Sequence, residues 1–169
     1  MSVKTIEDLF IHELSDIYSA EKQLTKALPK LARAADDAAL SDAFHTHLEE
    51  TQGQIERIDR VVEVLGIRLK RIKCAAMEGL VEEGKEIIDS IDQGALRDAA
   101  LIGGAQKVEH YEIAAYGTLA ALARQLGYKD ALPLLLETLE EEKATDQKLT
   151  MLAEQGGNQR AAQEGRKAA

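Results

Sequence analysis

The chain has 169 residues, with 21 lysines and arginines against 30 aspartates and glutamates, which gives a formal net charge of −9. This length suffices for one domain with a hydrophobic core. Aromatic residues make up only 4%, and the chain has two prolines and no tryptophan. Such a composition favours helices and argues against an all-β sandwich. The acidic balance argues against general binding of nucleic acid or of anionic membranes.

The compartment is predicted from cysteine usage and hydropathy. Cys74 is the only cysteine, so the chain has no disulfide framework, which is typical of a reducing compartment. Residues 1–10 lack the apolar run of a secretory signal, and no stretch approaches the roughly 18 apolar residues of a membrane-spanning helix. We therefore expect a cytoplasmic protein that does not enter a membrane.

Apolar residues recur at helical spacing in the first half of the chain. Over residues 5–36 they form one stripe, and Pro29 predicts a kink in its last two turns. A second stripe covers residues 40–65, and Gly66 is a plausible left-handed stop. The connection between the two helices is so short that they are expected to lie antiparallel, as a helical hairpin.

The second half repeats this arrangement, with predicted helices over 102–126 and 132–152. Roughly 30 residues separate the hairpins, too many for a tight turn, and 75–91 within them are themselves helical in pattern. The sequence thus predicts an all-α fold: a ferritin-like four-helix bundle of two antiparallel helical hairpins, with a long helical crossover between the second and third helices. We expect the bundle to occupy 1–157 and a flexible C-terminal tail to occupy 158–169.

Polar residues interrupt each apolar stripe near its middle, where leucine would be expected. None of the four stripes includes a lysine or an arginine. Burying even one unpaired carboxylate costs several kcal/mol, so these groups must bind a cation or be protonated. The interrupting residues that we predict as metal ligands are Glu21, Glu50, Gln54, Glu109, Glu112, Glu142 and Asp146.

The chemistry of these side chains favours two metal ions per chain, either iron or manganese. Oxygen-rich ligand sets suit these ions better than a structural zinc. Glu109 and Glu112 are three residues apart, and Glu142 and Asp146 are four apart, so each pair shares one helix face. Two bridged ions would balance most of the carboxylate charge.

Some positions near this predicted site have more than one interpretation. Glu21 lies about 15 residues from the first turn and Glu50 about 10, a mismatch of roughly 7 Å that the kink at Pro29, or Gln54 in place of Glu50, would absorb. His47 lies one turn before Glu50 and is either a ligand or a hydrogen-bonded core histidine, and we leave it off the predicted ligand set. Tyr116 is expected to be a core residue with a polar tip.

Four segments, residues 16–24, 47–51, 108–114 and 140–146, resemble the YciF/YciE family of ferritin-like bacterial stress proteins. The resemblance covers nearly the whole chain, from 4 to about 153. It implies a cytoplasmic, dimeric four-helix bundle with a dinuclear metal centre and a link to the stress response.

One departure from the wider ferritin-like group bears on activity. That group usually has Glu-x-x-His on its second and fourth helices, whereas the residues three after Glu50 and Glu142 are Gly53 and Thr145. The loss of both imidazoles weakens any transfer of ferroxidase, peroxidase or manganese-catalase activity to this chain.

Two classes of function follow from these observations. The first is a dinuclear metal protein that reacts with oxygen or peroxide, or that sequesters iron. The second is a non-catalytic stress adaptor, or a homodimeric interaction module, with a vestigial metal site and a contact face on the apolar residues of 75–91. Metal content distinguishes the two classes.

Overall fold

A computed structural model describes residues 3–168, which form helices and contain no strand. This confirms the prediction of an all-helical chain. The elements are α1 (Ile6–Ala34), α2 (Ala38–Leu65), α3 (Ala75–Ser90), α4 (Ala95–Leu126), α5 (Leu132–Leu152), the π-helical turn η1 (Ala153–Gly157) and α6 (Asn158–Ala168). Within residues 3–168, no helix combines the length and the apolar character that crossing a membrane requires.

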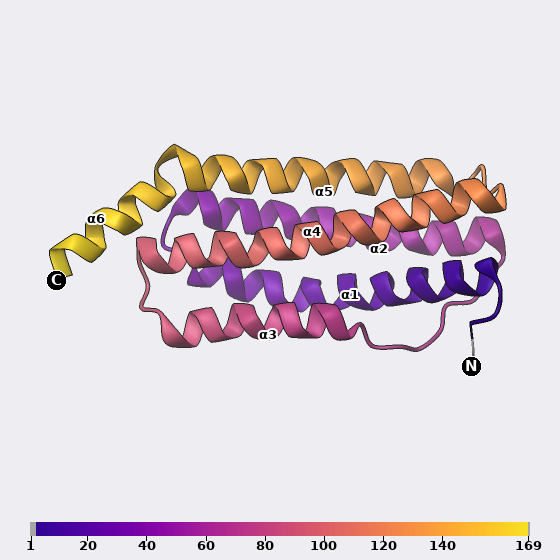
Figure 1. The fold of residues 1–169 in the computed structure, drawn as a ribbon, viewed down its shortest axis with the longest axis horizontal. Coiled ribbons are helices and arrows are strands. Elements are labelled where there is room, and N and C mark those ends of the chain that lie inside the picture. Colours follow the sequence, from indigo (N-terminus) through magenta and orange to yellow (C-terminus); the bar gives the residue numbers. More distant parts are fainter. Residues whose placement is uncertain (1–2, 169) are drawn as a thin grey trace.

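Four long helices, α1, α2, α4 and α5, lie side by side along the longest axis of the molecule (Figure 1). Helix α1 packs mainly on α2, and α4 mainly on α5, while α1 also contacts α4 and α2 contacts α5. The shorter α3 lies against α1 and α4. The buried residues of these helices form one core, to which each long helix contributes the apolar stripe seen in its sequence.

Local signals in the sequence explain where several helices begin and end. Thr5 caps α1: its hydroxyl accepts a hydrogen bond from the Asp8 amide, and the Asp8 carboxylate accepts one from the Thr5 amide. Gly66 and Gly127 end α2 and α4 in the left-handed conformation, with φ of 63° and 72°. Helix α1 continues past Pro29 to Ala34.

A buried aspartate joins the first hairpin to the second. Asp98, near the start of α4, is 5% exposed, and its two oxygens accept hydrogen bonds from the amides of Asp36 and Asp37, each at 2.8 Å. Because Asp37 also caps α2, one carboxylate fixes the connection between α1 and α2 against α4. Helix α4 begins at Ala95, seven residues before the apolar stripe that predicted it.

The segment after residue 157 was predicted to be a flexible tail, and its described part, 158–168, is the helix α6. The chain bends before it at Gly156, where φ is 127°. Two polar side chains of α6 contact the rest of the molecule. Arg160 forms an ion pair with Asp37, and Glu164 accepts a hydrogen bond from the Ala95 amide. The mobility of this segment stays a prediction, and residue 169 lies outside the described residues.

Candidate metal centre

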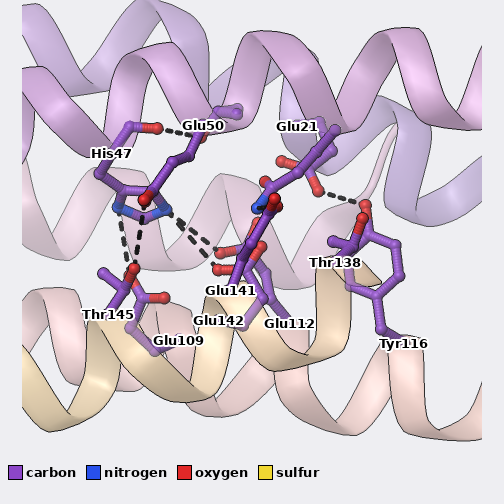
Figure 2. Close-up of polar contacts among 12 residues, drawn as sticks. Glu21, His47, Glu50, Glu109, Glu112, Tyr116, Thr138, Glu141, Glu142 and Thr145 are labelled. Atoms are coloured by element: carbon purple, nitrogen blue, oxygen red, sulfur yellow. Dashed lines mark hydrogen bonds and ion pairs between the residues drawn. The ribbon is translucent and has the colours of Figure 1, made fainter. Parts of the chain in front are cut away.

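Midway along the four long helices, polar side chains meet in the interior (Figure 2). The glutamates and the glutamine among them are 0% exposed, and the histidine is 3% exposed. They come from all four helices, one from α1, two from α2, two from α4 and one from α5. We call this set the buried polar cluster; it consists of Glu21, His47, Gln54, Glu109, Glu112 and Glu142.

One end of the cluster is built around His47. Its Nδ1 lies 3.2 Å from Oε1 of Glu109, and its Nε2 lies 3.8 Å from Oε2 of Glu142 and 3.9 Å from Oε2 of Glu112. One donor atom from each of these four residues lies within 4.8 Å of all the others. A single ion could therefore be held by an imidazole and several carboxylates at this end.

The other end is built around Glu21. Tyr116 Oη on α4 donates a hydrogen bond to Oε1 of Glu21 on α1, and Tyr116 itself is 1% exposed. The second oxygen of Glu21 has no hydrogen-bond partner. Figure 2 shows Glu112 and Glu142 between this end and the His47 end. Tyr116 is thus a core residue whose polar tip orients a cluster member, as its position in the stripe predicted.

Most polar atoms of the cluster have no hydrogen-bond partner. The short distance between His47 and Glu109 does not have hydrogen-bond geometry, and no ion pair among the described residues links the cluster to a lysine or arginine. Native proteins leave few buried polar atoms unpaired. The unpaired atoms are Glu21 Oε2, His47 Nε2, Gln54 Oε1 and both carboxylate oxygens of Glu109, Glu112 and Glu142.

Burial shifts the protonation of these carboxylates strongly. Desolvation raises the pKa of Glu21 to about 7 and the pKa of Glu109 to about 8. Desolvation raises the pKa of Glu112 and of Glu142 well above the usual range, and repulsion from neighbouring carboxylates adds to it. Without a cation, the cluster therefore keeps protons at neutral pH.

The pKa of His47 shifts in the opposite direction, to a lower value. Desolvation lowers the pKa of His47 to about 4, so its imidazole is neutral at pH 7. A neutral imidazole carries a lone pair and is the form that binds metal. Neutral imidazole and acidic carboxyls together form a donor set that a divalent cation fits, because the cation would replace the protons and pair with the orphaned oxygens.

Five of the seven predicted ligands lie in this cluster: Glu21, Gln54, Glu109, Glu112 and Glu142. Gln54 donates its amide hydrogen to Oε2 of Glu141, which leaves its Oε1 facing no donor. Glu50, one turn earlier, is only half-buried and accepts a hydrogen bond from Thr145 at 3.3 Å. The sequence left open whether Gln54 takes the place of Glu50 beside Glu21. Gln54 is the more deeply buried of the two side chains, so the structure favours Gln54.

Asp146 is not brought to the cluster, so its predicted inward orientation is wrong. Its side chain is 21% exposed, and its Oδ1 accepts a hydrogen bond from Gln106 and lies 3.3 Å from Nε2 of His110. The physical reason is rotation: a step of four residues from Glu142 overshoots a turn of 3.6 residues. Asp146 therefore lies beside α4, toward the outside.

His47 lies in the buried polar cluster, although the predicted ligand set left it out. It shares the inner face of α2 with Gln54, and its ring contacts three cluster carboxylates. In the sequence, the position of His47 at the polar interruption of the apolar stripe was the observation that could have placed it in the cluster. The sequence could not give its orientation, because a core histidine with an ordinary hydrogen-bond partner produces the same pattern.

Comparisons with known proteins agree over nearly the whole chain. Residues 5–162 match the family described as Domain of unknown function (DUF892). Protein YciF of Escherichia coli (strain K12) is 67% identical over 162 residues, which cover 95% of this chain and 98% of that protein. The crystal structure of the E. coli stress protein YciF superimposes with a TM-score of 0.90 at 68% identity, covering 92% of this chain and 99% of the other.

A second solved structure is also similar. YcfI of Rhodopseudomonas palustris, described as a candidate structural protein, superimposes with a TM-score of 0.85 at 48% identity. The match covers 88% of this chain and 95% of that one.

Proposed function

The chain belongs to the family described as Domain of unknown function (DUF892), as a homologue of the E. coli stress protein YciF, and on this premise we propose that it is a ferritin-like four-helix bundle that binds iron or manganese in its buried polar cluster. The resemblance predicted from its sequence is confirmed by these matches. The identity of the metal, the number of ions per chain and the chemistry of these ions are our proposal.

The observation that carries this proposal is the set of orphaned donor atoms. Four glutamates, 0% exposed, meet one another without a lysine or arginine within ion-pair distance in the described structure. Isolated carboxylates in such surroundings are costly unless a cation or protons neutralise them. Their convergence from α1, α4 and α5, rather than along one exposed helix face, distinguishes the set from an ordinary acidic surface.

The shape of the cluster suits two ions. His47 and Glu109 would serve one ion, and Glu21 and Gln54 Oε1 would serve the other, with the intervening carboxylates shared. A donor set of four carboxylates, one amide oxygen and one imidazole is rich in oxygen, which favours iron or manganese over a structural zinc. The imidazole makes the set less purely oxygen-based than the sequence alone predicted.

The fold supports the same assignment. Two antiparallel pairs, α1 with α2 and α4 with α5, are joined by a long connection that contains α3. Bundles with one long crossover include the ferritin-like folds, whose metal sites are built from carboxylates on facing helices. We extend the proposal to a homodimeric, cytoplasmic protein, as the family resemblance implies.

Bound iron or manganese would supply electron transfer to oxygen or peroxide, or would simply be sequestered. The chain's own residues would hold the donors in place: Tyr116 fixes one oxygen of Glu21, and Arg57 with Gln54 fixes Glu141 behind the cluster. A small pocket of about 90 Å³ is lined by Glu50 and Thr145, and none of the cluster residues lines it. Glu50 would accept an incoming ion there.

Elemental analysis tests the proposal directly. Protein purified without chelator, or reconstituted with iron(II) or manganese(II), is expected to contain about two ions per chain. The isosteric variant Glu112→Gln with Glu142→Gln should lose this metal, because it removes two central charges without changing volume. The matched control Glu49→Gln with Glu140→Gln changes two exposed glutamates outside the cluster and should bind normally. An optical spectrum taken while iron(II) meets air then separates oxidation from storage.

A second function has its own support. YcfI, with 48% identity, is described as a candidate structural protein, and protonated carboxyls could keep the cluster neutral without metal. The chain would then be a non-catalytic stress adaptor or a homodimeric interaction module. Absence of bound metal after reconstitution, together with the same oligomeric state before and after metal is added, would favour this alternative.

A further inference from the structure

A groove lies on the outside of the molecule between α1 and α3, which run side by side in Figure 1. It encloses about 660 Å³. Its apolar lining comes from Ala27 and Leu31 on α1 and from Val81 and Ile88 on α3. None of these residues belongs to the buried polar cluster. The volume falls in the range of roughly 300–1,000 Å³ that is typical of small-molecule sites.

The polar lining of this groove is basic, although the chain as a whole carries a net charge of −9. Five of the lining side chains are cationic: Lys26, Lys30, Arg33, Lys85 and Arg97. Asp89 is the one acidic residue that lines it in the described structure. Such a concentration of one sign is unexpected by chance on an acidic protein, and it raises the local concentration of anions.

Several of these cations are available to a ligand. Lys85 pairs with Glu82 at 3.2 Å, and Arg97 donates to the carbonyls of Ile91 and Ile88. In contrast, Lys26, Lys30 and Arg33 have no ion pair within the described residues, and all three are exposed. These three lie three or four residues apart on α1 and therefore share one face.

We propose that this groove binds a small amphipathic anion, of the class of medium-chain carboxylates, with its chain on the apolar lining and its carboxylate among the cations of α1. An apolar lining alone would accept any oily molecule, whereas basic residues along its α1 side select for a negative head. The volume fits one such molecule rather than a docked protein helix. The proposal does not depend on the metal, because the groove and the cluster share no residue.

Titration calorimetry with sodium decanoate, below its micelle-forming concentration, tests the inference on the whole chain. We expect saturable binding of one molecule per chain, with equal affinity for metal-free and metal-loaded protein. Shortening the ligand to octanoate should weaken binding by roughly fourfold for each methylene removed from the apolar lining. Decyltrimethylammonium, which has the same chain and the opposite charge, should bind at least tenfold more weakly.

Two variants locate the site. Lys30→Gln with Arg33→Gln should raise the Kd for decanoate by roughly tenfold and should reduce its dependence on ionic strength. The control, Arg124→Gln with Lys129→Gln, removes two exposed charges elsewhere and should bind decanoate as the parent does. The second site variant, Val81→Ser, should weaken binding without changing the salt dependence, and circular dichroism would verify that each variant is folded.

Other results would overturn the proposal. Equal binding of decanoate and decyltrimethylammonium would show nonspecific apolar adsorption. Absence of decanoate binding, with binding only to vesicles of phosphatidylglycerol, would identify the face as a membrane contact. Absence of decanoate binding, with a dimer that dissociates in the Lys30→Gln and Arg33→Gln variant, would identify it as the contact between two copies.

Discussion

The hydroxyl of Tyr116 on α4 donates a hydrogen bond to the carboxylate of Glu21 on α1, and both side chains are almost completely buried. This contact links the two hairpins at the level of the buried polar cluster. It also fixes one oxygen of Glu21 and leaves the other unpaired. The tyrosine therefore defines which lone pairs of this carboxylate remain for a bound ion.

Removing this hydroxyl should destabilise the protein. In Tyr116→Phe, an oxygen of Glu21 loses its donor in a buried setting, and we expect a loss of about 1–3 kcal/mol in the free energy of unfolding. Urea unfolding of the metal-free protein measures this loss. The control, Tyr18→Phe, removes a hydroxyl from a half-buried ring on α1 and should change stability by less than about 0.5 kcal/mol. Equal effects of both substitutions would contradict a specific role for the Tyr116 contact.

The metal-free protein should become less stable as pH rises from about 5 to about 8. Glutamates in the unfolded chain titrate near 4.5, whereas burial raises the pKa of Glu21 to about 7 and of Glu109 to about 8 in the folded protein. In this window the folded state holds more protons, so each rise in pH favours unfolding. His47 acts in the opposite direction, since its folded pKa of about 4 lies below its ordinary 6.5, but it is one group against four carboxylates.

Denaturant midpoints across this pH range check the prediction. The slope should become smaller in Glu112→Gln with Glu142→Gln, which removes two of the four shifted carboxylates, and should disappear when iron(II) or manganese(II) saturates the site. Stability of the metal-free parent that rises from pH about 5 to about 8 would mean that the cluster is already neutralised by something other than protons.

Sequence periodicity was sufficient to predict the long helices of this molecule, and the reasons are physical. Apolar stripes define the inner face of each long helix, and Glu21 and Glu112, which lie on such stripes, are buried. Glu50 also lies on a predicted stripe but is only half-buried. The stripe does not fix the rotation of a side chain at its edge, and for that reason Asp146 was assigned inward although it lies beside α4. The helix after residue 157 was missed because its partners, Asp37 and Ala95, lie far away in sequence.

Glu50 should control how fast metal enters rather than how much is bound. It is half-buried, accepts a hydrogen bond from Thr145, and lines a small pocket of about 90 Å³. In Glu50→Gln we expect slower uptake of iron(II), by roughly tenfold, at unchanged final stoichiometry. Stopped-flow absorbance follows the uptake, and the neighbouring exposed Glu49→Gln is the control. A lower stoichiometry in Glu50→Gln would instead place Glu50 among the ligands, as the sequence predicted.

Asp98 should be a major contributor to stability outside the cluster. Its carboxylate accepts two backbone hydrogen bonds at the connection between α1 and α2. Asp98→Ala removes both, and hydrogen bonds to a carboxylate contribute about 1.5–3 kcal/mol each, so we expect a loss of about 3–6 kcal/mol. Thermal and urea unfolding measure it. Asp92→Ala, at an exposed position just before α4, should be nearly neutral, and metal stoichiometry should be unchanged in both variants.

The sharpest test of the proposed metal site compares His47 with Asp146. The structure places the His47 ring among three carboxylates, at 3.2–3.9 Å, whereas Asp146 contacts Gln106 and His110 outside the cluster. His47→Ala should therefore weaken metal binding by roughly 10–100-fold, and Asp146→Asn should leave it unchanged. Titration with manganese(II), followed by electron paramagnetic resonance, measures both affinities in metal-free protein. Loss of binding in Asp146→Asn with retention in His47→Ala would show that the ligands follow the register predicted from the sequence and that the His47 end of the cluster holds no ion.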